Sequence, residues 1–305
     1  MGGCVSRRQL KQVEKEAYEL PSNLSNQSSP EPSNEKPDFC YQDGQYAHEK
    51  VIGKGGFGFV AQASDRNTGE LFAIKIEDSS FNSSLTEFAI FMRLDGLKTI
   101  PKFYEHWTEN NCTLMRMELL GPNLSDLSKN LGRPMKMLEA NEIAIQMIGV
   151  LKSVHEKGIV HCDVKPANFA FGIGPNHRHL YIMDFGLAES YLDPNGNHNK
   201  KCFTGVPKGT STYMSCNQHL NWKNSRRDDM ESIVYSCLEL IGIIPPWKLK
   251  CRIGMPNHAE FHSSKQSFFL PHVQFRKMLE MCRELKLIPP ESPSSKPLNA
   301  DELVN

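Results

Sequence analysis

Three polar residues of different chemistry lie close together in the stretch HCDVKPANFAFG. They are Asp163, Lys165 and Asn168, and a second acid, Asp184, follows in the stretch YIMDFG. Phosphoryl transfer needs such groups: a carboxylate to orient a hydroxyl nucleophile, an ammonium to neutralise the transferring phosphoryl, and an amide and a carboxylate to hold magnesium. The residue types and their spacing therefore indicate phosphoryl transfer, provided that two short loops hold them in place.

Short strands and a long helix are expected to position these residues. Ile159–Val160 and Phe169–Phe171 predict β segments on either side of the polar residues, which places those residues on a loop between rigid flanks. Before them, residues 138–157 predict a core helix, because apolar residues recur at helical spacing: Ile143, Met147, Val150, Leu151 and Val154.

A glycine-rich stretch far upstream, G-x-G-x-x-G at Gly53, Gly55 and Gly58, is a candidate phosphate-binding loop. Alone it is weak evidence, because dinucleotide-binding folds show the same pattern. In those folds the glycines open a helix, whereas here residues 59–63 and 71–76 predict strands. The pattern therefore favours a glycine hairpin that covers phosphates, and it argues against a nucleotide-binding dehydrogenase.

Lys75 lies in the second of these strands, and an inward lysine needs a carboxylate partner. Residues 84–94 predict a helix with an apolar side made of Leu85, Phe88, Ala89 and Met92, and Glu87 is the only acid in it. We therefore expect Lys75 to pair with Glu87. Strands are also predicted at 102–107 and 112–117, and residues 118–122 then predict a hinge whose backbone can read an adenine edge.

The composition excludes several classes of protein. Lys and Arg number 35, as do Asp and Glu, so no global field attracts the chain to nucleic acid. Nine scattered cysteines without a CxxC pair argue against a disulfide framework or a zinc site, and for a reducing compartment. No apolar run reaches the roughly 20 residues of a membrane span. We expect a cytoplasmic, monomeric protein.

The N-terminal residues MGGCVSRR fit the pattern for myristoylation at Gly2, with Ser6 at the required position. Cys4 stands where a palmitoyl chain can be added. One myristoyl chain binds membranes only marginally, with a constant of about 10⁴ M⁻¹, and a second acyl chain or basic residues make anchoring stable. Cys4 offers the first, and Arg7 and Arg8 offer the second. We expect acylation of Gly2 and Cys4 and partial association with the cytoplasmic face of a membrane. The alternative is an ordinary N-terminus with two small residues.

Taken together, the motifs resemble those of eukaryotic protein kinases, and the resemblance covers roughly residues 46–289. G-x-G-x-x-G-x-V, A-I-K, H-x-D-x-K-P-x-N and D-F-G occur in the family's order. Lysine two residues after the aspartate resembles serine/threonine kinases rather than tyrosine kinases. The resemblance implies an α+β, two-lobed protein kinase fold, with a small β-rich N-lobe and a larger helical C-lobe.

The resemblance also implies roles for individual residues, with ATP and Mg²⁺ as cofactors and with Ser or Thr residues of proteins as acceptors. Asp163 orients the substrate hydroxyl, Lys165 steadies the γ-phosphate, and Asn168 and Asp184 bind magnesium. His161 and Phe185 are expected to pack, together with Phe91. The implied ATP-binding residues are Ile52, Gly53, Gly55, Gly58, Val60, Ala73, Lys75, Glu87, Met117, Glu118 and Leu120.

Within the kinases, several stretches are similar to the casein kinase I group, with tau-tubulin kinases as close relatives. They are MELLGPNL at 117–124, with Met117 as gatekeeper, Ser215-Cys216-Asn217 in place of Ala-Pro-Glu, and SRRDDMES at 225–232. In the last of these, Asp229 is expected to hold the catalytic loop and also to cap its helix, which is predicted to extend to Ile241.

Three departures from the family pattern bear on function. Cys162 replaces the arginine that pairs with a phosphorylated activation loop in many kinases, which predicts activity without such phosphorylation. Thr212 stands where casein kinase I enzymes carry an arginine, and this leaves a preference for phosphate-primed sites open. The helix predicted at 275–287 is followed by a short tail, so that the last helix of the lobe is expected to be reduced or absent.

These observations predict how the chain is divided into segments, and they leave two hypotheses for its function. We expect an acylated arm (1–20), a Ser-, Pro- and Asn-rich linker (21–44), a kinase domain (45–289) with an N-lobe (45–117) and a C-lobe (122–289), and a tail (290–305). The favoured reading is an active serine/threonine kinase, since the complete catalytic set is present. The alternative is a pseudokinase, which keeps the fold as a scaffolding or binding module.

Overall fold

The computed structural model describes residues 45–54, 58–79, 83–109, 111–250 and 257–284. These residues form two compact units. The first contains the described residues of 45–82, 103–119 and 129–132, and the second contains the described residues of 83–102, 120–128 and 133–284. The predicted arm, linker and tail, and with them Gly2 and Cys4, lie outside the described residues, and so does Gly55.

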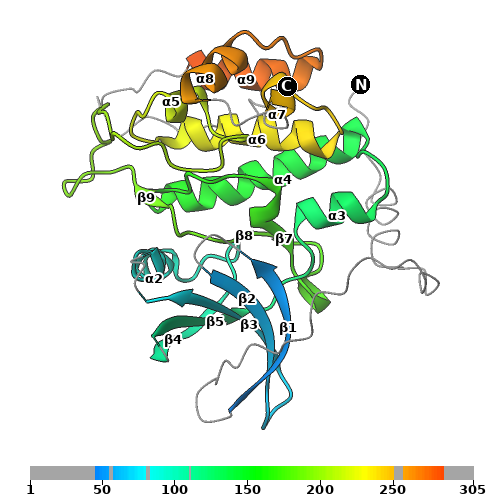
Figure 1. Ribbon diagram of the computed structural model, residues 1–305, viewed down its shortest axis with the longest axis vertical. Helices are drawn as coiled ribbons and strands as arrows, with labels where there is room; N and C mark the ends of the chain where they lie inside the picture. The colour runs from blue at the N-terminus through cyan, green and yellow to red at the C-terminus, as the bar shows by residue number, and fades with distance from the viewer. Residues whose placement is uncertain (1–44, 55–57, 80–82, 110, 251–256, 285–305) are drawn as a thin grey trace. The chain divides into compact units, whose positions relative to one another are not determined.

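A five-stranded antiparallel sheet makes up most of the first unit (Figure 1). Its order is β1-β2-β3-β5-β4, and all four strand pairs are antiparallel. The four strands predicted at 59–63, 71–76, 102–107 and 112–117 are confirmed as β2, β3, β4 and β5, with ends that differ by a few residues at most, and β1 is the fifth strand. The bounds are β1 (Tyr46–Lys54), β2 (Gly58–Asp65), β3 (Leu71–Asp78), β4 (Phe103–Glu109) and β5 (Cys112–Glu118).

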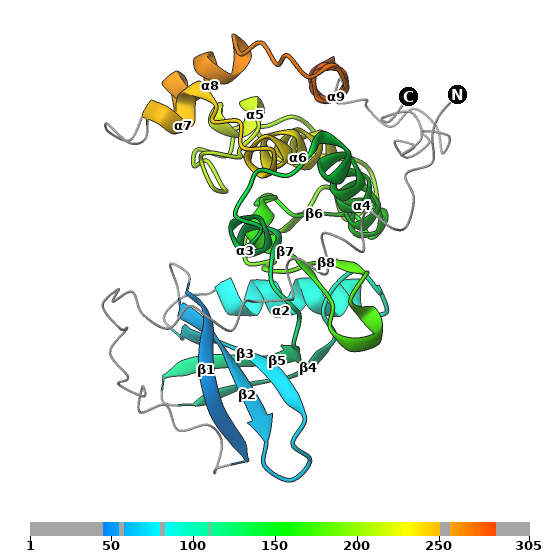
Figure 2. The ribbon, with the colours of Figure 1, turned by 90° about the vertical axis from the view of Figure 1, so that its right-hand side faces the viewer.

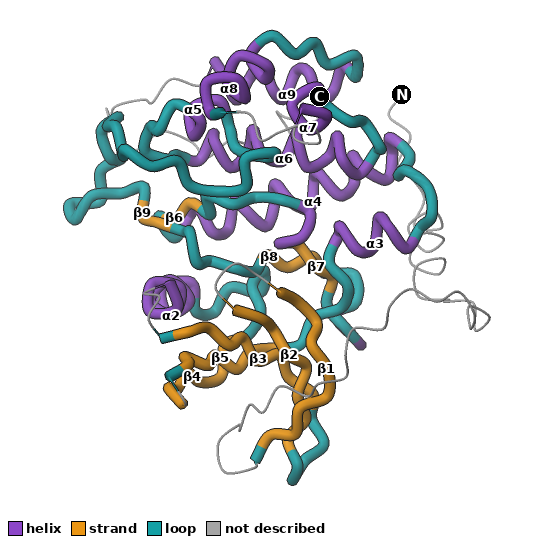
Figure 3. The backbone as a smooth tube through the Cα atoms, viewed as in Figure 1, coloured by secondary structure: helices purple, strands orange, loops and turns teal. Residues whose placement is uncertain are grey.

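Helices dominate the second unit (Figure 3). No described helix is long and apolar enough to cross a membrane. Four short strands pair in twos, β6 with β9 and β7 with β8, and they are β6 (Ile159–Val160), β7 (Phe169–Phe171), β8 (Leu180–Ile182) and β9 (Glu189–Ser190). The α-helices of the described chain are α2 (Ser83–Leu94), α3 (Leu124–Asn130), α4 (Met137–Glu156), α5 (Cys216–His219), α6 (Arg226–Leu240), α7 (Pro246–Lys250), α8 (His258–Gln266) and α9 (Val273–Glu284).

Two long helices, α4 and α6, pack side by side in the core of the second unit (Figure 2). The apolar stripe predicted for α4 is confirmed, because Ile143, Met147, Val150, Leu151 and Val154 are all buried. Helix α6 is buried along almost its whole length, and its buried residues include the acids Asp228 and Asp229. The predicted flanking strands are also confirmed as β6 and β7.

Helix α2 forms where it was predicted, but part of its predicted apolar side is exposed. Ala89 and Met92 are exposed. The buried residues are Glu87, Ile90, Phe91 and Leu94, which also recur at helical spacing. The helix therefore carries two candidate stripes, and the one that contains an acid is inside, because Glu87 and Phe91 contact Phe185. This contact also agrees with the grouping of α2 with the second unit rather than with the sheet.

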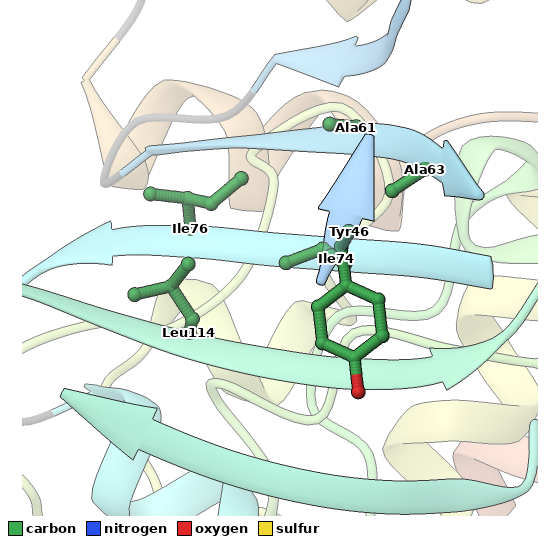
Figure 4. Packing of buried hydrophobic residues seen from close by; sticks show 6 residues of the cluster. All are labelled: Tyr46, Ala61, Ala63, Ile74, Ile76 and Leu114. Atoms are coloured by element: carbon green, nitrogen blue, oxygen red, sulfur yellow. The ribbon is translucent and has the colours of Figure 1, made fainter. Parts of the chain in front are cut away.

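One face of the sheet packs an apolar cluster made of Tyr46, Ala61, Ala63, Ile74, Ile76 and Leu114 (Figure 4). Successive side chains of a strand point to opposite faces. Because Ile74 and Ile76 of β3 face this cluster, Ala73 and Lys75 lie on the opposite face. The apolar cluster thus determines which residues of β3 are available for a site.

Candidate active site

Asp163 is held by groups that bind both of its carboxylate oxygens. Lys165 Nζ donates to Oδ2 at 2.6 Å, and the backbone N–H of Thr210 donates to Oδ1 at 2.7 Å. Lys165 Nζ also donates to the hydroxyl of Thr210 at 3.0 Å. Asp163 itself is only 8 % exposed. The carboxylate is therefore fixed in orientation before any substrate binds.

Asn168 closes the same loop from the other side. Its Nδ2 donates to the backbone carbonyl of Asp163 at 2.9 Å, which leaves Oδ1 as the atom that would ligate a metal ion. The loop ends in one 3₁₀ turn over Pro166–Asn168, where the proline suits the start of the turn. The backbone N–H of Met183 donates to the carbonyl of Asn168 at 3.0 Å, and Asp184 follows directly.

The donor set of Asn168 and Asp184 fits magnesium better than a metal that needs a protein cage. No group of three or more His, Cys, Asp or Glu side chains within the described residues could hold a metal ion. Magnesium is typically bound by one or two protein groups together with phosphates and water. Asp184 is exposed and has φ +66°, a conformation that is uncommon for residues other than glycine. Such a constrained residue agrees with a functional position.

Asp229, near the start of α6, holds the backbone immediately before Asp163. Its Oδ2 accepts from the N–H of His161 at 2.8 Å and from His155 Nε2 at 2.8 Å, and its Oδ1 accepts from the N–H of Cys162 at 2.9 Å. Burial alone would raise the pKa of Asp229, but the hydrogen bonds from His155 and His161 hold this pKa below its ordinary value. The expectation that Asp229 positions the catalytic loop is confirmed.

The expectation that Asp229 also caps α6 is wrong. The N-cap is Ser225, and the capping partner is Asp228, whose Oδ2 accepts from the N–H of Ser225 at 2.8 Å. Three positions into the helix, Asp228 can reach back to the N-cap, whereas Asp229 is one position further along and faces the catalytic loop. The two neighbouring acids therefore divide the two tasks.

Gln218 ties the catalytic loop to the segment that precedes Thr210. Its Nε2 donates to the carbonyl of Cys162 at 2.8 Å and to the carbonyl of Lys208 at 3.1 Å. Gly209, between Lys208 and Thr210, has φ +114°, and a Cβ there would lie 2.6 Å from the Cys162 carbonyl. Glycine is thus required where the two segments approach each other.

The packing expected for His161 and Phe185 is confirmed. The ring of Phe185 lies 5.0 Å from that of His161 and 5.5 Å from that of Phe91. His161 Nε2 contacts the carbonyl of Met183 at 3.1 Å. Glu87 accepts from the N–H of Phe185 at 3.0 Å. These contacts fix the backbone on both sides of Asp184.

In the first unit, the strand register brings several predicted ATP-binding residues onto one face of the sheet. Gly53 pairs with Val60, and Val60 pairs with Lys75. Ala73 pairs with Met117. Directly opposed residues share a face, so Val60, Ala73, Lys75 and Met117 lie together, on the side away from the apolar cluster of Figure 4. One face therefore offers small and apolar side chains around a lysine.

Lys75 makes an ion pair with Glu77 of the same strand, at 3.0 Å. Sequence reasoning missed this partner, although residues two apart on a strand share a face. The expected pair with Glu87 would join the two units and stays a prediction. Of the other predicted ATP-binding residues, Ile52 is exposed in β1, Glu118 ends β5, and Leu120 follows in the second unit.

The two described glycines of the predicted phosphate loop differ in their surroundings. A Cβ at Gly58 would lie 1.9 Å from the carbonyl oxygen of Ile76, so a side chain there would force β2 and β3 apart. A Cβ at Gly53 would make only ordinary contact with Val60, at 3.7 Å. Gly58 therefore has a structural requirement that does not depend on phosphate binding.

A comparison with known protein families agrees with the residues that the structure places around Asp163 and Lys75. The family model described as "Protein kinase domain" matches residues 46–278, which is most of the chain. The chain belongs to the protein kinase family. Membership implies a phosphotransferase that acts on proteins with ATP as the donor, typically with Mg²⁺. The expectation of a protein kinase fold, with a β-rich part and a helical part, is confirmed.

Three contacts of this kinase were not found from its sequence. Thr210 and Gln218 lie far from Asp163 along the chain, and both are hydrogen-bonded to the loop around it. His155 is hydrogen-bonded to Asp229, which in turn binds the backbone of that loop. A pocket of about 570 Å³ lies elsewhere in the second unit and includes none of the predicted site residues. Its lining includes Phe269, Leu270, Val273, Arg276 and Arg283.

Proposed function

We propose that this chain is an active serine/threonine protein kinase of the casein kinase I type. The observation that carries the proposal is the fixed Asp163 carboxylate, bound by Lys165 Nζ at 2.6 Å and by the Thr210 N–H at 2.7 Å. A preorganised carboxylate is suited to orienting an alcohol for attack. Lysine at position 165, within reach of both Asp163 and Thr210, supports serine and threonine as acceptors.

Each residue would have a defined task. ATP would supply the γ-phosphoryl group, with Mg²⁺ to neutralise its charge. Asp163 would accept the hydrogen bond of the acceptor hydroxyl, and Lys165 would shift from Asp163 toward the incoming negative charge. Asn168 and Asp184 would hold the metal ion. The nucleotide would contact Ile52, Gly53, Gly55, Gly58, Val60, Ala73, Lys75, Glu87, Met117, Glu118 and Leu120.

The assignment to the casein kinase I group is supported by a contact between two of the stretches on which it rests. Asp228 Oδ1 accepts from Ser215 Oγ at 2.7 Å and from Asn217 Nδ2 at 3.1 Å. Both donors belong to the Ser-Cys-Asn stretch that replaces Ala-Pro-Glu. The two stretches are therefore in direct contact through buried hydrogen bonds.

Activity without activation-loop phosphorylation is part of the proposal. The side chain at position 162 is a buried thiol that donates only weakly, to the Val160 carbonyl at 3.7 Å. Thr210 is instead held by Asp163, and Lys208 before it is held by Gln218. A phosphate is thus not needed to dock this segment. Phosphatase-treated enzyme should keep its activity, and a loss of activity after treatment would contradict this part.

The main test is transfer of labelled γ-phosphate to casein and to a serine peptide, with Asp184→Asn as the inactive control. We expect labelled phosphoserine from the wild type and at least a 100-fold lower rate from the variant. Phosphotyrosine as the product would overturn the serine/threonine assignment. Equal signals from both proteins would show that another enzyme is responsible, and no transfer by the folded wild type would favour the pseudokinase.

Acylation of Gly2 and Cys4, and with it partial location at a membrane, is proposed from the sequence MGGCVSRR alone. Because stable anchoring needs a second signal beside one lipid chain, Gly2→Ala should release the protein into the soluble fraction. Cys4→Ser should do so in part, since Arg7 and Arg8 remain beside the myristoyl chain. Ser6 stays intact in both variants. Identical fractionation of Gly2→Ala and wild type would end the proposal.

A further inference from the structure

Lys265 of α8 is a lysine in an unusual place, because its side chain is 0 % exposed. Lysine is almost never fully buried unless its charge is satisfied. Its Nζ lies 3.0 Å from the Ser211 carbonyl, 2.6 Å from the Met214 carbonyl and 3.1 Å from His219 Nε2. Three acceptors match the three N–H donors of an ammonium group. The geometry is therefore that of an ammonium group whose three donors are all satisfied by buried acceptors.

Aromatic rings surround the same ammonium group. The Nζ lies 4.6 Å from the ring centroid of Tyr235, 5.3 Å from that of Trp247 and 5.7 Å from that of Phe261. Such distances allow cation–π attraction, which is stronger when the cation is removed from water. The rings come from α6, α7 and α8, so Lys265 lies where three helices meet.

His219 is held in the state that accepts a hydrogen bond from Lys265. Its ring stacks on Phe261 with centroids 4.9 Å apart, and its Nδ1 lies 2.9 Å from Nδ1 of His258. Burial, and then the charge of Lys265 and the proximity of His258, lower the pKa of His219 to about 2. His219 is therefore neutral at any pH at which an enzyme works, and it remains an acceptor.

The carbonyls that Lys265 binds belong to a turn that also contacts Asp163. Residues 210–214 form a turn, because the N–H groups of Tyr213 and Met214 both donate to the Thr210 carbonyl. We name it the acceptor turn, because it contacts Asp163, which is proposed to orient the hydroxyl that accepts the phosphoryl group. At one end the Thr210 N–H donates to Asp163. At the other end Lys265 holds the carbonyls of Ser211 and Met214, and Trp247 Nε1 donates to the Thr212 carbonyl at 3.0 Å.

We propose that Lys265 is a positioning residue for the phosphoryl-acceptor side of the active site, and that it acts through the acceptor turn. The inference rests on the proposed function, since it assigns to Asp163 the orientation of the acceptor hydroxyl. Lys265 fixes the turn to the helices, the turn fixes Thr210, and Thr210 fixes Asp163. Removal of the ammonium group leaves two carbonyls and His219 without their donor, and the turn shifts relative to the carboxylate.

The test compares Lys265→Met with Lys277→Met. Methionine is close to lysine in shape but lacks the donors, and Lys277 is an exposed lysine on α9. We measure kcat and KM for a serine peptide, and KM for ATP, at matched concentrations of folded protein. A misplacement of about 1 Å can cost on the order of 100-fold in rate. We expect Lys265→Met to lose 10- to 100-fold in kcat, with KM for ATP unchanged, and Lys277→Met to match the wild type.

A second readout reports the position of the turn without any catalysis. Because Thr210 donates its N–H to Asp163, its amide should exchange slowly with deuterium in the wild type and much faster in Lys265→Met. The variant His219→Phe keeps a ring on Phe261 and removes one of the three acceptors of Lys265, together with the contact to His258. It should show changes of the same kind but smaller, since two of the three acceptors remain, and it tests the proposal if Lys265→Met fails to fold.

The outcomes separate this inference from the proposed function. An unchanged kcat in folded Lys265→Met, with unchanged exchange at Thr210, overturns the inference and leaves the function intact. A second outcome is that activity per total protein falls only as much as the folded fraction does, while the KM values and the exchange at Thr210 stay normal. This result would show a purely structural role for Lys265 and would also overturn the inference. Absence of activity in the wild type overturns the proposed function, while the exchange experiment still decides whether Lys265 holds the turn.

Discussion

The catalytic loop around Asp163 and the β1–β2 hairpin are held in place by different means. The loop is held by side chains from distant parts of the chain: Asp229 and Gln218 bind its backbone, and Thr210 binds its carboxylate. The hairpin is aligned by strand pairing, with register shifts between His48 and Lys50 and between Val51 and Gly53. Substitutions at the partners of the loop should therefore cost both stability and activity, whereas the hairpin should respond only to steric fit.

The largest expected effect is that of Asp229→Asn. An amide keeps one acceptor, but its NH₂ group would face backbone N–H groups that now donate to a carboxylate, and hydrogen bonds to charged groups are worth about 1.5–3 kcal/mol each. We expect the free energy of unfolding to fall by about 3 kcal/mol, since a buried network is broken, and kcat to fall with it. Urea denaturation measures the first and the peptide assay the second.

The control for this variant is Glu280→Gln, which removes a carboxylate from the exposed side of α9. It should change the stability by no more than about 0.5 kcal/mol. If Asp229→Asn were as stable as this control, the catalytic loop would not depend on its buried partner, and the difference between loop and hairpin would disappear.

The second comparison lies within the hairpin. Gly58→Ala would place a Cβ 1.9 Å from the Ile76 carbonyl oxygen, whereas Gly53→Ala would place one 3.7 Å from Val60. Forcing atoms into a packed site costs about 1–3 kcal/mol. We expect Gly58→Ala to lose stability in that range and Gly53→Ala to lose less than about 0.5 kcal/mol. Thermal unfolding of both measures the difference, and equal losses would mean that the hairpin is not limited by steric room.

A smaller effect is expected where the catalytic loop meets the acceptor turn. Thr210→Val removes the hydroxyl that binds Lys165 at 3.0 Å and keeps the backbone N–H that binds Asp163. The rate should fall about 3- to 10-fold, in line with the loss of roughly 1 kcal/mol from one hydrogen bond. Thr212→Val, two residues further along the turn, is the matched control. A larger loss in the control would show that Lys165 does not depend on this hydroxyl.

The last prediction concerns the pH dependence of stability. The pKa of Asp229 is lower in the folded protein than its ordinary value near 3.9. The stabilisation from Asp229 is therefore complete above that ordinary value and is lost as the pH falls through the folded pKa. In urea titrations, wild type and Asp229→Asn should converge below about pH 4. A constant difference down to pH 2 would show that the charge of Asp229 contributes nothing.

Asp228 serves as an internal control of opposite sign. Burial raises its pKa in the folded protein despite hydrogen bonds from Ser215, Asn217 and Ser225. Its contribution is therefore complete below the ordinary pKa and declines as the pH rises through the folded pKa. The difference between wild type and Asp228→Asn should shrink as the pH rises, in contrast to that seen for Asp229→Asn.

Strand β3 and helix α4 could be predicted from the sequence because the apolar residues of each are buried. Helix α2 could not be fully predicted: its two stripes are both plausible, and only the contact of Phe91 and Glu87 with Phe185 decides between them. The ends of a helix can be predicted from neighbouring residues in the sequence. Which face of the helix is buried depends on the elements that it packs against.

The residues of the candidate site could be predicted from the sequence, but the side chains that hold them in position could not. Nothing local marks His155 as the partner of Asp229, or Lys265 as buried rather than solvated on a polar helix. Such pairs join residues that are tens of positions apart, so spacing carries no signal for them. The capping role was assigned to the wrong acid for a related reason, since Asp228 and Asp229 differ by one position and hence by the face of α6 on which they lie.

Cys162 has a consequence for chemical reactivity. Its thiol is buried, and burial, with Asp229 and Glu189 nearby, raises its pKa well above the ordinary value. Only a thiolate reacts readily with oxidants or electrophiles, so the buried thiol of Cys162, next to Asp163, is unreactive. Among the cysteines of the described residues, Cys202 is the exposed one. An electrophilic inhibitor or label would therefore modify the surface at Cys202 and leave the catalytic loop unmodified.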